Sequence, residues 1–161
     1  MEFARAVREV KHDETIRRVR GSDRPIYDTI HGSAEAVAAQ IEKIHEEETG
    51  DFFYNNEQVL RSMIKLAYFS YRDSYIKFEE LPSRDGYADI VYLPKKASPV
   101  PVIVIELKWN RSARGAIDQI RDKKYPNVLD GYEGDILLVG IAYDKDGKKE
   151  GRKHTCPIEK A

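Results

Sequence analysis

The hydrophobic positions of this chain divide it into segments of helical and of strand spacing. Apolar residues recur every three or four positions after Ser33, which predicts a helix over residues 33–48. The same spacing follows Asn55 or Asn56, either of which can cap a helix that runs to about residue 67. A third helical pattern covers residues 112–125, and Pro126 prevents its continuation.

Strand patterns occupy the rest of the central and C-terminal chain. Residues 75–81 alternate, with Ile76 and Phe78 on one face and Tyr75 on the other. Residues 102–105 have no polar break, as in a central strand that is buried on both faces. The complete set of expected strands is 75–81, 87–93, 102–108, 135–143 and 152–158.

Short turns join the first three strands, which predicts an antiparallel meander. The helix over 112–125 then acts as a crossover, so that the strand over 135–143 can run parallel to the one over 102–108. The expected fold class is therefore α/β, with α and β elements around one central mixed sheet flanked by helices.

The first 30 residues are highly charged and have only a weak helical pattern, which Gly21 to Asp23 and Pro25 interrupt. We interpret residues 1–50 as a helical extension or linker and residues 51–161 as one folded domain. A chain of 161 residues is long enough to bury one core of this kind.

Charged residues interrupt two strands where a core strand should have none. Glu106 and Lys108 are two residues apart, so both project to one face of their strand, and Asp89 lies in the preceding strand. Buried charges are costly unless they are paired or hold a metal, so these residues form a candidate site for a hard cation and a phosphate. Alternatively, Asp89 caps a turn or pairs with Lys108, and Glu106 lies at a solvated strand end.

The order of these residues resembles the catalytic core of the PD-(D/E)XK nuclease superfamily. Asp89 falls at the aspartate of the motif, Glu106-Leu107-Lys108 matches the (D/E)XK element, and Gln119 lies on the helix that follows. Lys123-Lys124-Tyr125 at the end of that helix resembles the bacterial branch that is often found C-terminal to an AAA-ATPase-like domain. The resemblance runs from about Asn55 to the end of the chain and implies a restriction-endonuclease-like core.

The resemblance also implies roles for individual residues. Asp89, Glu106 and the backbone carbonyl of Leu107 would hold Mg²⁺, or Mn²⁺ in its place, and Glu57 matches an additional acidic position of some relatives. Lys108 would orient the attacking water or stabilise charge in the transition state, and Gln119 would orient that water or Lys108. Each has a simpler alternative, since Gln119 can be a surface residue and Glu57 a first-turn acid favoured by the helix dipole.

Basic residues near this site are candidates for contacts with nucleic-acid phosphates. They lie on or beside the helix over 112–125 and are Arg111, Arg114, Arg121 and Lys124. The alternative is a solvated helix face that Asp118 and Asp122 balance.

Composition narrows the possible partners. With 27 basic and 28 acidic side chains the net charge is −1, so any nucleic-acid contact needs a local patch. Cys156 is the single cysteine, which agrees with a cytoplasmic location, and no apolar run is long enough to span a membrane. A phosphate-binding G-x-x-x-x-G-K-[ST] loop is missing, so an ATPase-like partner domain is not contained in this chain.

Three functions agree with these observations. The first is a metal-dependent nuclease, a Mg²⁺-dependent endonuclease or phosphodiesterase that hydrolyses nucleic-acid phosphodiester bonds. The second is a catalytically silent nuclease-fold module that binds nucleic acid or protein and works with an ATPase-like partner domain. The third is a structural domain in which the ion pair only holds the strands together.

Overall fold

A computed structural model describes residues 24–49, 57–83, 86–96, 98–109, 114–122, 127–144 and 153–161. Its helices are α2 (Arg24–Ile30), α3 (Ala34–Thr49), α4 (Glu57–Ala67) and α5 (Arg114–Asp122), with short 3-10 helices η1 (Phe69–Asp73) and η2 (Asn127–Leu129). Its strands are β1 (Tyr75–Ser83), β2 (Gly86–Pro94), β3 (Val102–Trp109), β4 (Ile136–Tyr143), β5 (His154–Thr155) and β6 (Ile158–Lys160).

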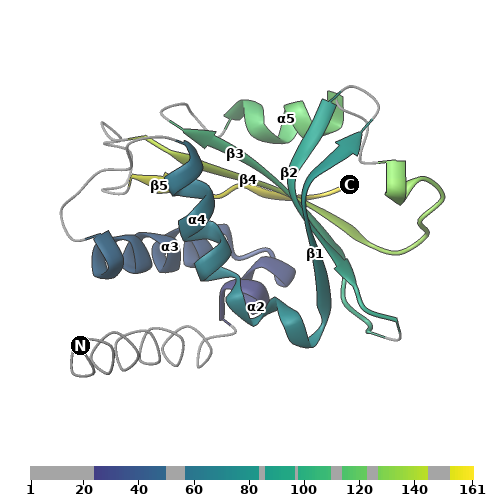
Figure 1. Ribbon diagram of the computed structural model, residues 1–161, viewed down its shortest axis with the longest axis horizontal. Coiled ribbons are helices and arrows are strands. Elements are labelled where there is room, and N and C mark those ends of the chain that lie inside the picture. Colours follow the sequence, from purple (N-terminus) through teal and green to yellow (C-terminus); the bar gives the residue numbers. More distant parts are fainter. Residues whose placement is uncertain are drawn as a thin grey trace, which may run out of the picture.

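The strands form one mixed sheet with the order β1-β2-β3-β4-β5, and β6 also pairs with β4. β1, β2 and β3 are antiparallel neighbours, whereas β3 and β4 are parallel, with α5 between them in the chain (Figure 1). This confirms the expected meander, the crossover and the mixed sheet flanked by helices. Within the described residues, none of the helices combines the length and apolar character that crossing a membrane requires.

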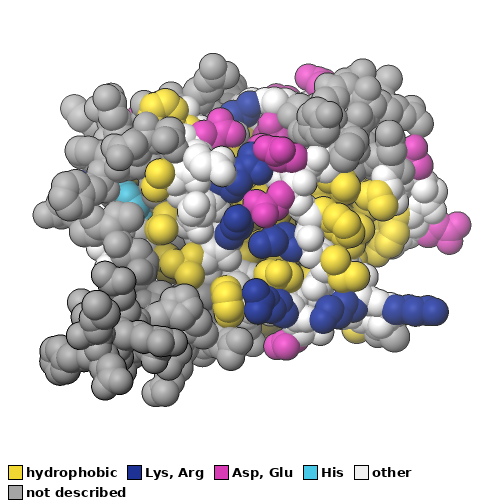
Figure 2. All heavy atoms as spheres, in the orientation of Figure 1, with side chains coloured by type: hydrophobic (Ala, Val, Ile, Leu, Met, Phe, Trp, Pro, Cys, Tyr) yellow, Lys and Arg dark blue, Asp and Glu magenta, His cyan; other side chains and the backbone are white. Residues whose placement is uncertain are grey.

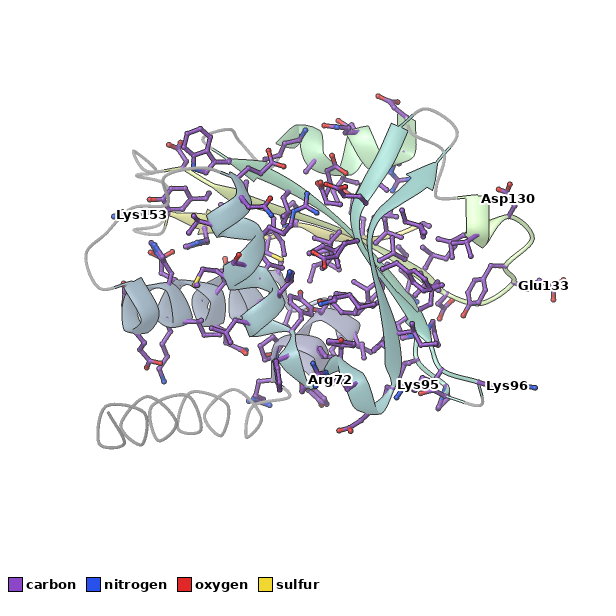
Figure 3. All side chains as sticks on the ribbon, in the orientation of Figure 1. Arg72, Lys95, Lys96, Asp130, Glu133 and Lys153 are labelled. Atoms are coloured by element: carbon purple, nitrogen blue, oxygen red, sulfur yellow. The ribbon has the colours of Figure 1, made fainter. Side chains whose placement is uncertain are left out.

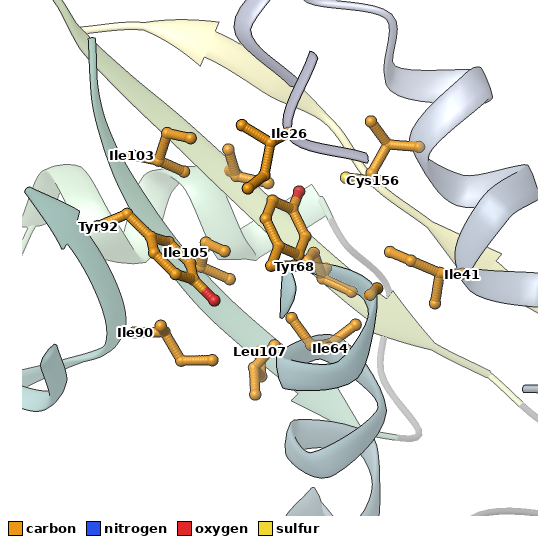
Figure 4. Packing of buried hydrophobic residues seen from close by; sticks show 14 of the residues in the cluster. Ile26, Ile41, Ile64, Tyr68, Ile90, Tyr92, Ile103, Ile105, Leu107 and Cys156 are labelled. Atoms are coloured by element: carbon orange, nitrogen blue, oxygen red, sulfur yellow. The ribbon is translucent and has the colours of Figure 1, made fainter. Parts of the chain in front are cut away.

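The sheet separates two hydrophobic clusters. The larger one contains residues of α2, α3 and α4, which cover one face of the sheet, and Figure 4 shows it around Tyr68, Ile105 and Leu107. The smaller one lies under α5, which contributes Ile117 and Ile120. The expected burial of β3 on both faces is confirmed, because all residues from Val102 to Leu107 are buried. This strand is the rigid element from which the candidate site projects.

Pro25, which follows the weak N-terminal pattern, lies in the first turn of α2. Proline is tolerated there, since an N–H group in a first turn has no partner within the helix. The Thr29 hydroxyl hydrogen-bonds both the Pro25 carbonyl (2.6 Å) and the Tyr68 hydroxyl (2.7 Å), which joins α2 to the end of α4. Residues 1–23 lie outside the described part of the chain.

The prediction of one last strand over 152–158 is wrong, because two short strands, β5 and β6, occupy this part of the chain. Cys156 and Pro157 separate β5 from β6, and proline has no N–H group to continue the ladder. The Pro157 carbonyl still accepts a hydrogen bond from the Gly140 N–H (3.0 Å), so both short strands remain aligned with β4.

β5 is also attached to α3 through Glu42, whose carboxylate contacts the His154 ring and accepts a hydrogen bond from its backbone N–H (3.2 Å). Burial acts to raise the pKa of Glu42, but the hydrogen bonds and charge of His154 outweigh it and hold that pKa below its ordinary value of 4.5. The pair fixes the C-terminal strands against the helical layer.

Two buried tyrosines provide a test of this packing. The Tyr92 hydroxyl is buried and has no hydrogen-bond partner among the described residues, whereas the Tyr75 hydroxyl donates to the Pro101 carbonyl (2.7 Å). Tyr92→Phe should therefore raise the free energy of unfolding by about 1 kcal/mol, and Tyr75→Phe should lower it by about 1 kcal/mol. Chemical denaturation measures both, and equal destabilisation by the two changes would contradict the structure. Burial raises the pKa of both phenols, so both stay protonated near neutral pH.

Candidate active site at the ends of β2 and β3

The site begins where β2 and β3 separate. Their paired register runs from Tyr92↔Ile103 to Ile90↔Ile105 and ends there, while β3 continues beside β4 as far as Trp109. The Leu107 N–H points toward the gap and donates to Asp89 Oδ2 (2.8 Å). The Asp89 carboxylate thus takes the place of a backbone acceptor. Without it, the partly buried Leu107 N–H group would lack this acceptor.

Glu106 and Lys108 lie on the face of β3 opposite to Leu107. Leu107 belongs to the larger cluster, whereas Val102 and Val104, which share the alternation of Glu106 and Lys108, lie in the cluster under α5. Glu106 is only 3% exposed. The shared face that the sequence predicts for this carboxylate and this lysine is therefore present.

Gln119 reaches the site from α5. Its neighbours Ala116 and Ile120 are buried against the sheet, and this packing brings the Gln119 side chain to the end of β3. The Lys108 ammonium donates a hydrogen bond to the Gln119 side-chain carbonyl. Contact between these two residues is thus a feature of the structure.

One cleft of about 410 Å³ brings the candidate residues together. Its lining contains every residue that the sequence suggested for metal binding or catalysis, and one more, Trp109. The lining residues are Glu57, Asp89, Glu106, Leu107, Lys108, Trp109 and Gln119.

Arg61 is a component of this region that the sequence reasoning missed. It lies on α4, is 7% exposed, and donates to Asp89 Oδ1 (3.0 Å) and to the Asp89 backbone carbonyl (3.2 Å). Asp89 is thus paired with Arg61 instead of Lys108. The available signal was the position of Arg61 four residues after Glu57, on the helix face that the cleft shares.

Glu80 lies opposite Asp89 and has an unusual backbone. It stands between the paired positions Glu79↔Ile90 and Leu81↔Ala88, and its φ of 51° is in the left-handed region. For a residue other than glycine this conformation costs about 1–2 kcal/mol. The Glu80 carboxylate lies 4.0 Å from Arg61 Nη2.

Ion pairs connect α4 to the sheet along this side of the molecule. Figure 2 shows basic and acidic side chains alternating in a band between α4 and β1. Arg61 joins α4 to β2, and one helical turn further on Lys65 joins α4 to Glu79 of β1 (3.3 Å).

The donor set of the cleft fits a hard divalent cation. Asp89, Glu106 and the Leu107 carbonyl supply oxygen atoms, and Mg²⁺ in proteins prefers oxygen ligands and retains several waters. In the part of the chain that the structure describes, no three His, Cys, Asp or Glu side chains form a metal-binding group. A cation here would therefore depend on two carboxylates, a backbone carbonyl and water.

The candidate phosphate-binding residues are only partly described. Arg121 donates to Glu159 Oε2 (2.9 Å) and to the Lys160 carbonyl (3.5 Å), so it joins α5 to β6. Arg111, Lys124 and the side chain of Arg114 lie outside the described residues.

Comparison with known proteins agrees with this architecture. A family model described as the PD-(D/E)XK nuclease superfamily matches residues 55–153, which is more than half of the chain. No curated protein matches the chain. The matched segment begins just before α4 and contains β1 to β4 and all seven residues that line the cleft. With its mixed sheet, flanking helices and this match, the chain belongs to the PD-(D/E)XK nuclease superfamily and has a restriction-endonuclease-like fold.

Proposed function

We propose that this protein is a divalent-metal-dependent nuclease that hydrolyses phosphodiester bonds of nucleic acid. The observation that carries the proposal is the single cleft in which Asp89, Glu106, Lys108 and Gln119 meet, in a member of a nuclease superfamily. Asp89, Glu106 and the Leu107 carbonyl are the proposed ligands of Mg²⁺ or Mn²⁺, and Glu57 is a further acidic group at the cleft.

The two carboxylates are held in different environments. Asp89 is fixed by the Leu107 N–H and by Arg61, and Glu106 is almost completely removed from solvent. A negative charge with few surrounding waters attracts a cation more strongly than an exposed one does. When bound, a divalent cation supplies polarisation of the phosphodiester and lowers the pKa of an attacking water.

Lys108 is the proposed residue at the reacting atoms. Its ammonium carries three donors, of which Gln119 accepts one, so the others can reach a water or a phosphoryl oxygen. An ammonium group fixed in this way stabilises the negative charge that develops when water attacks the phosphodiester. Gln119 is then a positioning residue, because it acts through Lys108.

A second candidate function is favoured by the state of Asp89. Both of its carboxylate oxygens accept hydrogen bonds from the protein, as expected if the site holds the strands without turnover. The protein would then be a silent nuclease-fold module that binds nucleic acid or protein beside an ATPase-like domain. In either case the proposed location is the bacterial cytoplasm, where a lone cysteine such as Cys156 stays reduced.

A cleavage assay separates the two functions. Purified protein is incubated with end-labelled single- and double-stranded DNA and RNA in the presence of Mg²⁺, Mn²⁺ or EDTA. The nuclease proposal expects cleavage that requires metal and disappears on chelation. Binding without cleavage, retained in Asp89→Ala, would support the binding module, and neither binding nor cleavage would contradict both.

Gln119→Ala should lower kcat about tenfold, because Lys108 loses the acceptor that fixes its ammonium. Gln119→Glu keeps an acceptor oxygen and should retain most of the activity. The metal-induced rise in melting temperature should be unchanged in Gln119→Ala, which distinguishes positioning of Lys108 from general damage to the site. Gln58→Ala, an exposed glutamine of α4, is the matched control, and equal losses from Gln58→Ala and Gln119→Ala would contradict the assignment.

A further inference from the structure

The guanidinium of Arg61 lies beside the place that a cation bound to Asp89 would occupy. It donates to Oδ1 of this carboxylate and to the backbone carbonyl of the same residue, and only 9% of the Arg61 side chain is exposed. Three acidic groups line the adjacent cleft, Glu57, Asp89 and Glu106. Arg61 therefore already supplies positive charge to a site rich in carboxylates.

A divalent cation at Asp89 and a guanidinium at its Oδ1 would repel each other. Both positive groups would share one carboxylate, and like charges that lie close together in a largely buried position repel strongly. The guanidinium at Oδ1 thus opposes binding of the cation, and its movement away from Oδ1 would relieve this repulsion.

Glu80 provides a second position for this guanidinium. Its carboxylate is already 4.0 Å from Arg61 Nη2, on the strand next to Asp89. The Glu80 side chain is 73% exposed and can change its rotamer freely. The left-handed backbone at Glu80, which a residue with a side chain seldom adopts, occurs directly opposite the carboxylate that Arg61 would leave.

We propose that Arg61 is an internal counter-ion of Asp89 that a divalent cation displaces, and that Glu80 receives the guanidinium when this happens. The inference rests on the proposed metal site and gives Arg61 and Glu80 opposite effects on metal affinity. Removal of Arg61 removes the competing charge, whereas removal of the Glu80 charge removes the alternative partner.

A double-mutant cycle read by metal binding alone tests this proposal. Wild type, Arg61→Met, Glu80→Gln and the double variant are titrated with Mn²⁺ and Mg²⁺, and the apparent Kd is obtained from calorimetry and from the rise in melting temperature. Arg61→Met should bind Mn²⁺ about tenfold more tightly, and Glu80→Gln about threefold more weakly. In the double variant the effect of Glu80→Gln should vanish.

The Lys65–Glu79 pair offers a matched control, since it joins α4 to β1 as Arg61 and Glu80 do, but the ion pair with Asp89 is made by Arg61. Lys65→Met and Glu79→Gln should leave the Kd within twofold of wild type. If Arg61 only holds Asp89 in place, Arg61→Met should weaken metal binding, and that result would overturn the proposal. Additive effects of the two changes on the Kd for metal would overturn it as well.

If Arg61→Met does not fold, Glu80→Gln alone remains decisive, because its exposed side chain can be changed without loss of packing. An unchanged Kd in Glu80→Gln would then overturn the proposal. If the four proteins show the expected Kd values but the wild type cleaves no nucleic acid, the nuclease function is refuted and the movement of Arg61 is supported. If the wild type cleaves nucleic acid but Arg61→Met leaves its Kd for metal unchanged, the nuclease function is supported and the movement of Arg61 is refuted.

Discussion

Replacement of Lys108 by alanine should abolish metal-dependent cleavage and leave both the fold and metal binding intact. The loss should be at least about 10³-fold in kcat, which is typical when a charged group that stabilises the transition state is removed. Lys108 is half-buried at the end of β3, so its truncation removes little apolar contact, and the carboxylates of Asp89 and Glu106 remain. Single-turnover cleavage of labelled DNA and RNA measures the chemical step.

The control for this experiment is Lys96→Ala. Figure 3 shows Lys96 projecting outward from the turn after β2, away from α4, and it is exposed. This variant has the same change in charge and should cleave at the wild-type rate. A Lys108→Ala protein that kept a tenth of the wild-type rate would exclude the proposed role of Lys108. Loss of metal-induced stabilisation in the same variant would indicate that Lys108 serves the metal site instead.

Asp89→Ala should lower the free energy of unfolding by about 2–4 kcal/mol, independently of any metal. It leaves the largely buried guanidinium of Arg61 without its carboxylate and the Leu107 N–H without its acceptor. For a protein of this size the melting temperature should fall by about 5–12 °C. The rise in melting temperature on addition of Mn²⁺ should be lost as well.

Two further variants separate the structural from the metal-binding role of Asp89. Asp89→Asn keeps an acceptor for the Leu107 N–H and should recover part of the stability without recovering the effect of metal. Arg61→Met combined with Asp89→Ala should be more stable than the sum of the single changes, because the unpaired charge is gone. An Asp89→Ala protein as stable as wild type would show that the Arg61 ion pair contributes nothing to folding.

The features that the sequence predicts well are those that depend on neighbouring residues. The apolar run at Val102 to Ile105 indicates a buried central strand, and alternation alone places Glu106 and Lys108 on one face. The meeting of Gln119 with Lys108 was expected only through the family resemblance, since it requires α5 to pack on the sheet in one orientation.

The ion pair between Arg61 and Asp89 could not be predicted in the same way. The two residues are 28 positions apart, and they meet because β2 and β3 diverge beyond Ile90 and Ile105. A lone arginine on an amphipathic helix is most simply interpreted as solvated. The short helix α2 was not predicted, because proline disfavours a helix interior but is compatible with a first turn, where Pro25 lies.

The position of β1 at the edge of the sheet affects how the protein resists aggregation. It pairs only with β2 among the described strands, so its other edge is open, and Ile76 and Phe78 are 50% and 39% exposed on it. Open edges with apolar side chains are templates for pairing with another chain, and charges on the strand oppose this. Lys77 interrupts the otherwise apolar stretch from Tyr75 to Phe78. Resistance to aggregation therefore depends on the charged side chains of this outermost strand, Lys77 together with Glu79 and Glu80.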